Sequence, residues 1–208
     1  MLNPKAINGE HILNDEWSLW YENPNEHTST YGENIKEIYS FQSVENFWKL
    51  YHNTNKASQL KPSSSYFLFR KGVTPQWEDP QNENGGRWIH YCNYPSSSNS
   101  NEVNEENEKQ KEMKDIEKVK EEIEEKWVNA MLACIGEDFP SSEFVKGCVI
   151  NSKRNQMRIS LWINCKDNQK MNKLIGQKFK MILNIENEKV VFHYHQNDSA
   201  DYYNLLSL

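Results

Sequence analysis

The sequence predicts an α+β fold in which helices pack on one face of an antiparallel sheet. Several short segments alternate apolar and polar residues, which is typical of strands with one buried face. Three longer stretches repeat apolar residues at helical spacing, and they interleave with the strands too irregularly for a repeating βαβ unit. The chain has 208 residues, enough for one domain with its own core, so we expect a single domain over residues 1–208.

The strand pattern recurs along most of the chain. The expected strands lie around residues 17–21, 66–69, 87–92, 145–150, 159–163 and 190–194. The first helix should begin behind Ser43, because a serine side chain caps the free N–H groups of a helix start. Its apolar side consists of Val44, Phe47, Trp48 and Tyr51.

Two further helices follow from the same spacing. The second should end near Gly136, since glycine is common at helix C-termini. The third should begin behind Asp167. The apolar stripe of the second is Ile116, Val119, Ile123, Trp127 and Met131, and that of the third is Met171, Leu174, Ile175, Phe179 and Ile182.

A polar insert separates the third and fourth expected strands from one another. Residues 95–112 consist mostly of Ser, Asn, Glu and Lys, with almost nothing to bury. We expect this low-complexity insert to be a disordered loop or an extension of the second helix, most simply a solvated segment without function.

Charge is distributed unevenly. The net charge is −6, and residues 102–126 hold 11 acidic and 6 basic residues, a net of −5, which leaves −1 for the rest. A nearly neutral body is poorly suited to a long nucleic acid but can bind one nucleotide with a few phosphates.

The four cysteines lack paired spacing, which indicates reduced core thiols and no metal site. The sequence shows neither a secretory signal nor an apolar run of roughly 18 residues, so we expect a soluble, cytoplasmic protein. We also expect it to be a monomer.

The clearest binding signal is an aromatic and acidic pair between two prolines. Trp77 and Glu78 lie in the segment Pro-Gln-Trp-Glu-Asp-Pro at residues 75–80, which reads as a loop. An indole on a loop either folds into the core or binds a flat ligand. A neighbouring carboxylate can accept two hydrogen bonds from the edge of guanine, and no other base offers that pair of donors.

A second ring and several cations complete a hypothetical site. A guanine methylated on its imidazole ring is positively charged, which strengthens its attraction to aromatic faces. Tyr31, in the loop after the first strand, could be the second ring, although alone it reads as an ordinary surface tyrosine. Lys153, Arg154 and Arg158 lie in and beside a predicted hairpin, where they could bind phosphates or simply be solvated.

Another surface could bind a partner helix. Val44 and Trp48 share one face of the first helix, and Val128 and Leu132 share one face of the second. Such stripes are usually core. An exposed part of Trp48 would instead let a short helix dock through its apolar face.

Together these features resemble the cap-binding translation initiation factor 4E family over nearly the whole chain. The resemblance rests on residues 17–20, 41–48, 77–79, 85–88, 135–137 and 147–151. It implies a curved antiparallel sheet of about eight strands, backed by three helices on the convex face. It also implies binding of the 7-methylguanosine cap of messenger RNA, without catalysis and without a cofactor.

The resemblance assigns roles to individual residues. Tyr31 and Trp77 would sandwich the base, with Glu78 on its hydrogen-bonding edge and Trp162 near the methyl group. Lys153 and Arg158, with Arg154 beside them, would hold the phosphates. An initiation scaffold of the factor 4G type, or a 4E-binding repressor, would dock through a short helix on His11, Ile12, Val44, Trp48, Val128, Asn129 and Leu132.

Two departures keep alternatives open. Tyr31 stands where the family usually has tryptophan, and Asn129 stands where it usually has an acid. The chain could therefore recruit a scaffold for initiation, or it could be a cap-binding repressor or specialised paralogue that does not. A cap-processing enzyme has little support, because the sequence has no dinucleotide fingerprint or phosphate loop. His193 and His195 share a strand face but lack a third metal ligand nearby in the sequence.

Overall fold

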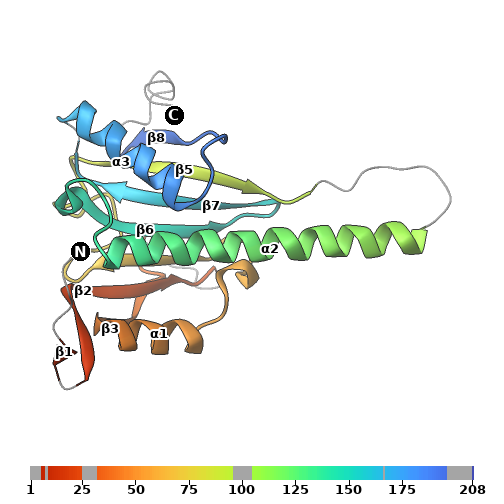
Figure 1. Cartoon of the computed structure of the whole chain (residues 1–208), viewed down its shortest axis with the longest axis horizontal. Helices are drawn as coiled ribbons and strands as arrows, with labels where there is room; N and C mark the ends of the chain where they lie inside the picture. The colour runs from red at the N-terminus through yellow and green to blue at the C-terminus, as the bar shows by residue number, and fades with distance from the viewer. Residues whose placement is uncertain (1–5, 8, 25–31, 96–104, 166, 196–207) are drawn as a thin grey trace.

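The structure is a computed structural model that describes residues 6–7, 9–24, 32–95, 105–165, 167–195 and 208, without the side chains of 6–7 and 105–109. Its elements follow in chain order (Figure 1). They are β1 (Ala6–Ile7), β2 (Glu10–Glu22), β3 (Ile35–Ser43), α1 (Val44–Asn53), the short helix η1 (Ala57–Gln59), β4 (Ser65–Arg70), β5 (Gly86–Asn93), α2 (Glu105–Ile135), η2 (Ser142–Phe144), β6 (Val145–Ser152), β7 (Gln156–Ile163), α3 (Gln169–Ile182) and β8 (Val191–Tyr194).

The strands form one curved sheet of eight strands in which every pairing is antiparallel. Its order is β1-β2-β4-β6-β7-β5-β8, and β3 pairs with β2. α1, α2 and α3 lie on the same face of this sheet (Figure 1). The expected fold class, an antiparallel sheet of about eight strands backed by three helices, is therefore confirmed.

The main core fills the space between the sheet and the helices. Its largest side chains come from strands and helices alike, among them Trp17, Phe47, Trp88, Trp127 and Phe179. Apolar residues at helical and strand spacing thus meet in one layer, as their periodicity predicts. Residues that alternate with these core residues along each strand point to the opposite face of the sheet, which we call the open face.

The open face carries a second apolar cluster of its own. Phe67, Phe69, Val73, Val149 and Trp162 form it, and Trp20 and Ile35 pack against it. Because its side chains enter cores on both faces, β4 is buried at five consecutive positions from Ser65 to Phe69. The second cluster positions the candidate site described below.

Two helix starts test the expected caps. Ser43 caps α1, since its hydroxyl accepts a hydrogen bond of 3.2 Å from the backbone N–H of Asn46, and this prediction is confirmed. The cap of α3 is Asn168 and not Asp167, because the Asn168 side chain accepts from the N–H of Met171 at 3.0 Å. Either residue type suits this position, and the register of the apolar stripe selects the later one.

The end of α2 differs from its expected form. The helix ends at Ile135 as expected, but the left-handed residue is Glu137, with φ 53°, and not Gly136. The N–H of Glu137 donates to Cys134 O at 3.1 Å and that of Asp138 donates to Ala133 O at 2.9 Å. These two bonds form the closing pattern that commonly has glycine at the left-handed position.

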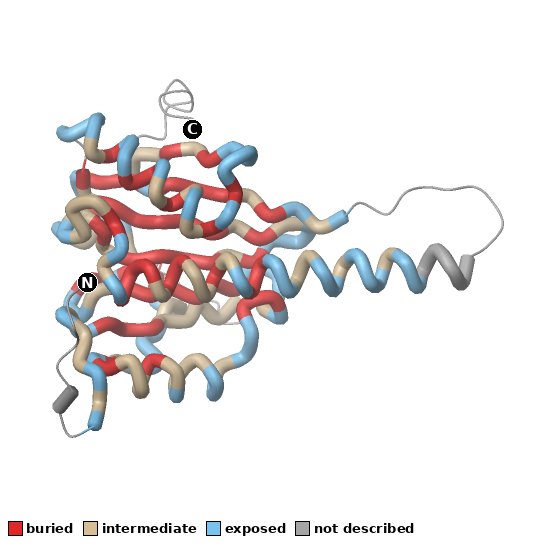
Figure 2. The backbone as a smooth tube through the Cα atoms, viewed as in Figure 1, coloured by how far each residue is buried: buried red, intermediate tan, exposed pale blue. Residues whose placement is uncertain are grey.

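α2 extends well beyond the edge of the sheet (Figure 1). Residues 105–112, the last part of the predicted insert, form its first turns, whereas residues 96–104 lie outside the described part. Figure 2 shows that the projecting half of α2 is mostly exposed. Among the described residues, no helix is both long and apolar enough to cross a membrane.

Candidate functional site

Trp77 lies on a loop between β4 and β5 that its own side chains hold in shape. The carboxylate of Asp79 accepts hydrogen bonds of 2.8 Å from the backbone N–H groups of Thr74 and Gln81. Asn82 is only 1% exposed, and its Nδ2 donates to the carbonyl oxygens of Thr74 at 2.9 Å and Gln76 at 2.8 Å. The loop backbone is thereby fixed before any ligand arrives.

On this fixed loop the two predicted ligand-binding side chains face solvent. The indole of Trp77 is 43% exposed, so it is not folded into the core. The Glu78 side chain next to it is also exposed. Asp79 serves the loop itself, whereas Trp77 and Glu78 remain available for a flat ligand with hydrogen-bond donors at its edge.

Tyr31, the expected second ring, lies outside the described residues, but its neighbour Gly32 is placed. Gly32 has φ +87°, and a Cβ atom added there would lie 2.0 Å from Nε2 of Gln76. Only glycine fits this close approach and this backbone conformation without strain. The chain next to Tyr31 therefore touches the residue that precedes Trp77.

Trp162 lies on β7 at the same end of the sheet as the Trp77 loop. Its ring is 6% exposed, and Phe69 packs edge-on against it at 5.4 Å between centroids. Val73, at the start of the loop, belongs to the same cluster. At the end of the loop, the N–H of His195 donates to Gly85 O at 3.2 Å. Trp162 thus adjoins the site, with most of its surface covered by protein.

The predicted phosphate-binding residues divide into two groups. Arg158 lies on β7, on the open face with Trp162, and its Cζ stands 5.3 Å from the ring centroid of Tyr91. Its Nε donates to Oε1 of Gln156 at 2.9 Å. Lys153 and Arg154 are exposed in the turn between β6 and β7. The structure therefore brings Arg158 to the open face and leaves the other two at the end of the hairpin.

Sequence reasoning missed Arg87. This exposed residue pairs with Trp162 across β5 and β7, and its Cζ lies 5.8 Å from the Trp162 ring centroid. The sequence contained a signal for Arg87. Trp88 is a core residue, and because side chains alternate along a strand, the adjacent Arg87 must point to the open face. Asp79 and Asn82 were also missed as residues that position Trp77.

His193 and His195, at the C-terminal edge of the sheet, lie near the positive side chains of the open face. Burial, with a contribution from Arg87, lowers the pKa of His195 to about 3. Burial followed by the charges of Arg87 and Arg158 also lowers the pKa of His193. Both imidazoles are therefore neutral near pH 7. In the part of the chain that the structure describes, no three His, Cys, Asp or Glu side chains are grouped as metal ligands would be.

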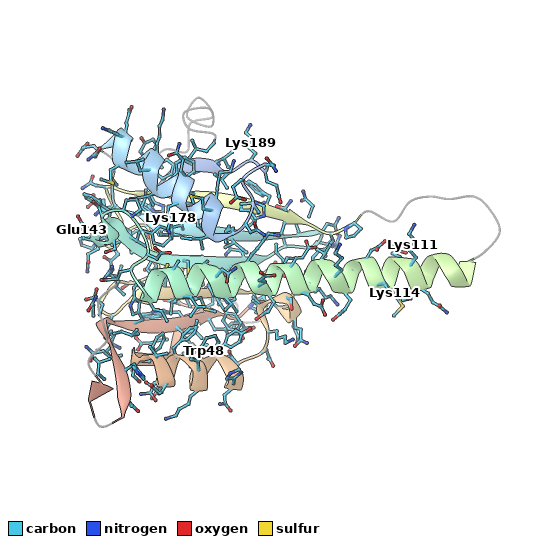
Figure 3. The ribbon with its side chains drawn as sticks, in the orientation of Figure 1. Trp48, Lys111, Lys114, Glu143, Lys178 and Lys189 are labelled. Carbon is cyan, nitrogen blue, oxygen red and sulfur yellow. The ribbon has the colours of Figure 1, made fainter. Side chains whose placement is uncertain are left out.

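The residues expected to bind a partner lie on the helical side. Trp48 is partly exposed on α1 (Figure 3), and its ring packs edge-on to Phe47 at 5.0 Å and stacks on His52 at 5.8 Å. His11 is joined to α1, since its N–H and Nδ1 lie 2.8 and 2.7 Å from the Glu45 carboxylate. The partly buried members of the set are Ile12, Val44, Trp48, Val128, Asn129 and Leu132.

Comparison with known proteins gives consistent matches in sequence and fold. The family described as eukaryotic initiation factor 4E matches residues 12–204. Eukaryotic translation initiation factor 4E-2 of Schizosaccharomyces pombe is 33% identical over 203 residues, covering 94% of this chain and 73% of that protein. Eukaryotic translation initiation factor 4E of Candida albicans is 33% identical over 189 residues, covering 90% and 80%.

Two solved structures share the fold. Ascaris suum eIF4E-3, in complex with the m7G cap, matches with a TM-score of 0.75 and 29% identity, covering 92% of this chain and 94% of that chain. C. elegans eIF4E-3, in complex with the 4E-binding protein Mextli, matches with a TM-score of 0.78 and 25% identity, covering 96% and 99%.

Proposed function

Because the chain belongs to the eukaryotic initiation factor 4E family, whose members are binding factors and not enzymes, we propose that it binds the 7-methylguanosine cap of messenger RNA and recruits a scaffold protein for translation initiation. The observation that carries this proposal is the exposed indole of Trp77 beside the exposed carboxylate of Glu78 on a rigid loop. We place this activity in the cytoplasm, with the protein acting as a monomer.

The base site follows from this pair. Trp77 stacks on the methylated, positively charged guanine, and Glu78 accepts two hydrogen bonds from its edge. Tyr31 provides the opposite face of the sandwich, which the contact between Gly32 and Gln76 supports. Trp162 borders the methyl group.

The phosphate site continues from the base site along the open face. Arg158 and Arg87 lie on the same face as Trp162 and attract the phosphate chain that extends from the base. Lys153 and Arg154, at the end of the β6–β7 hairpin, can reach outward to later phosphates. The near-neutral remainder of the protein favours one nucleotide over a long strand.

The partner site lies on the other side of the sheet, so cap and partner do not compete for space. A short helix from the scaffold docks its apolar face on Val44, Trp48, Val128 and Leu132. Trp48 is the expected anchor, because tryptophans are enriched among the few residues that contribute most of the binding energy at such interfaces. Figure 3 shows that this residue belongs to α1, on the helical side of the molecule.

The cap proposal is tested by retention on immobilised 7-methylguanosine diphosphate. We expect the wild type to be retained, and to be eluted by the methylated but not by the unmethylated nucleotide. Trp77→Ala and Glu78→Gln should pass through the column, and Trp48→Ala, on the helical side, should be retained. Equal retention on immobilised guanosine diphosphate would reject the proposal.

Tyr31 and Asn129 favour one alternative, a cap-binding repressor or specialised paralogue that does not engage the scaffold. Asn129 carries no charge to hold a basic side chain of the partner. A pull-down with a scaffold helix peptide separates the two functions. Capture that Trp48→Ala abolishes supports recruitment for initiation, whereas a protein that binds cap but not the peptide is the repressor.

A further inference from the structure

The open face of β7 continues past the proposed cap site toward the β6–β7 hairpin. Side chains at every second residue of a strand share a face and lie about 7 Å apart along it. Trp162, Arg158 and Gln156 therefore follow one another on the open face, whereas the residues that alternate with them belong to the main core. Arg158 lies about 13 Å from Trp162 along the strand. A cap whose base lies beside Trp162 and whose phosphates reach Arg158 carries its next nucleoside toward Gln156.

Four side chains meet at this place, Tyr91 and Asn93 from β5 and Gln156 and Arg158 from β7, and we call them the outer cluster. In the register of the two strands, Tyr91 lies opposite Arg158. Asn93 lies opposite Gln156 in the next row. Side chains opposite each other in an antiparallel ladder point to the same face, with Cβ atoms about 5 Å apart. Asn93 is exposed and the other three are partly exposed, so the outer cluster is accessible to a ligand.

Contacts within the outer cluster hold the guanidinium of Arg158 in place. Its Nε donates to Oε1 of Gln156 at 2.9 Å, and its Cζ stands 5.3 Å from the ring centroid of Tyr91. Gln156 is held in turn, because its Nε2 donates to Oδ1 of Asn93 at 3.3 Å. A cation at this distance is attracted by the face of an aromatic ring. Tyr91 and Gln156 therefore orient Arg158 before a phosphate arrives.

The same arrangement provides a flat surface and a polar group next to Arg158. A tyrosine ring and a guanidinium both stack on nucleobases, and here the two are in contact and partly exposed. A carboxamide has its oxygen and its nitrogen on opposite sides. Because Oδ1 of Asn93 faces Gln156, its Nδ2 faces away from Gln156 and can donate to a ligand. A stacking surface, an amide and a phosphate-binding cation together suit a nucleoside that is joined to a phosphate.

We propose that the outer cluster binds the first nucleoside after the triphosphate of the cap, with the base of that nucleoside stacked on Tyr91. This inference rests on the proposed function and extends the same site by one nucleoside. Arg158 binds the phosphate chain that precedes this nucleoside, and Asn93 donates a hydrogen bond to the nucleoside itself. Because every base has a face for stacking, the site accepts any of the four bases.

Two ligands that differ by this nucleoside test the proposal. The affinities of 7-methylguanosine-triphosphate-adenosine and of 7-methylguanosine triphosphate are measured for each protein by titration calorimetry, and the first is divided by the second. Tyr91→Ala should lower this ratio about fivefold or more, which is the factor expected for the loss of one stacked base. Tyr91→Phe keeps the ring and should keep the ratio of the wild type.

The ratio also separates stacking from an indirect effect through Arg158. If Tyr91→Ala only displaced the guanidinium, 7-methylguanosine triphosphate would lose at least as much affinity as the dinucleotide, because its terminal phosphate carries more charge. The ratio would then stay constant or rise. Tyr39→Ala, at an exposed tyrosine of β3, is the matched control and should leave both affinities unchanged.

The outcomes separate this inference from the proposed function. A ratio that Tyr91→Ala leaves constant or raises overturns the role of Tyr91, even if both ligands bind. A wild type that binds neither ligand overturns the proposed function instead. Should Tyr91→Ala fold poorly, an NMR spectrum of the wild type with the bound dinucleotide gives the same answer. Cross-relaxation peaks must connect the ring protons of Tyr91 with the adenine protons, and their absence rejects the inference.

Discussion

The imidazole of His195 packs against the indole of Trp162, with ring centroids 4.1 Å apart and planes inclined by 39°. Its Nε2 is buried, and among the residues that the structure describes it has no hydrogen-bond partner. Such a contact suits a neutral ring, because burial disfavours the protonated, charged imidazole. Arg87, whose guanidinium also lies near Trp162, disfavours that proton further.

This contact predicts a pH dependence of stability. The pKa of His195 is about 3 in the folded protein and its ordinary value is 6.5. Above pH 6.5 neither state binds the proton. As the pH falls, the unfolded chain is protonated first, so folding loses stability from about pH 6.5 down toward pH 3.

Urea unfolding at pH 7 and pH 5 measures the loss. We expect the wild type to lose about 1 to 2 kcal/mol more than His195→Gln between these values. The pKa values of His90 and His193 are also lowered, but both residues remain in the variant and contribute equally to each protein. An identical loss in the two proteins would show that His195 is not the group responsible.

A second prediction concerns Tyr31. If Tyr31 stacks on the cap base, Tyr31→Trp should bind 7-methylguanosine diphosphate about two- to tenfold more tightly, because an indole offers a larger and more negative face to a cationic ring. Quenching of tryptophan fluorescence during a titration measures the affinity. Tyr39→Trp, at an exposed position of β3, is the matched control and should leave it unchanged. An unchanged constant in Tyr31→Trp would mean that another ring does the stacking.

Periodicity was sufficient to predict the parts of the fold that have one clearly buried side. The three helical stripes and the Ser43 cap correspond to observed helices. β3 was missed because, in the described part of the chain, it pairs only with β2, and its residues from Lys36 to Tyr39 are all exposed, so it lacks a buried alternating pattern. An edge strand of this kind depends on its neighbour more than on its own sequence.

For the candidate site, the sequence predicted which residue types bind the ligand, but not the contacts that hold those residues in place. A tryptophan and a glutamate between two prolines indicate a ligand, and the structure exposes both. The bonds that Asp79 and Asn82 make within the loop could not be read from the chain, because polar loop residues of these types occur in every surface turn. Alternation with Trp88 is enough to place Arg87 on the open face, but its position opposite Trp162 required knowledge that β5 and β7 are neighbours. The role of Tyr31 stays a prediction.

The loop geometry gives a third prediction, at Asn82. The buried amide donates to two carbonyl oxygens at 2.8 and 2.9 Å. Asn82→Asp replaces this donor with an acceptor of similar size, so the carbonyls lose their partner and face a negative charge. We expect a loss of about 1 to 3 kcal/mol in stability and a cap affinity at least about tenfold lower, because Trp77 is no longer held in place.

The control for Asn82 is a neighbouring polar residue whose side chain makes no such bonds to the residues that the structure describes. Glu83→Gln changes an exposed side chain of the same loop and should retain both stability and cap affinity. Urea unfolding and a cap titration are measured for each protein. If Asn82→Asp bound cap like the wild type, the loop would not need its internal hydrogen bonds to present Trp77.

The last prediction separates two roles of Glu137 at the end of α2. Its carboxylate accepts a hydrogen bond from Asn14 Nδ2 at 2.8 Å and lies 3.3 Å from the guanidinium of Arg70, whose Cζ in turn stands 5.0 Å from the Trp17 ring centroid. Its backbone, with φ 53°, is in the left-handed region that favours glycine. The side-chain contacts therefore offset a backbone conformation that is unfavourable for glutamate by about 1 kcal/mol.

Glu137→Ala and Glu137→Gly both remove the carboxylate, but only glycine also removes the backbone cost. We expect Glu137→Ala to lose about 1 to 3 kcal/mol of unfolding free energy, and Glu137→Gly to be more stable than the alanine variant by about 1 kcal/mol. Urea unfolding with equal slopes for both variants gives the comparison. Because Glu137 lies away from the open face, cap affinity should remain that of the wild type. Equal stability of the two variants would mean that the left-handed backbone carries no cost at this position, and that the carboxylate is retained for its contacts with Arg70 and Asn14 alone.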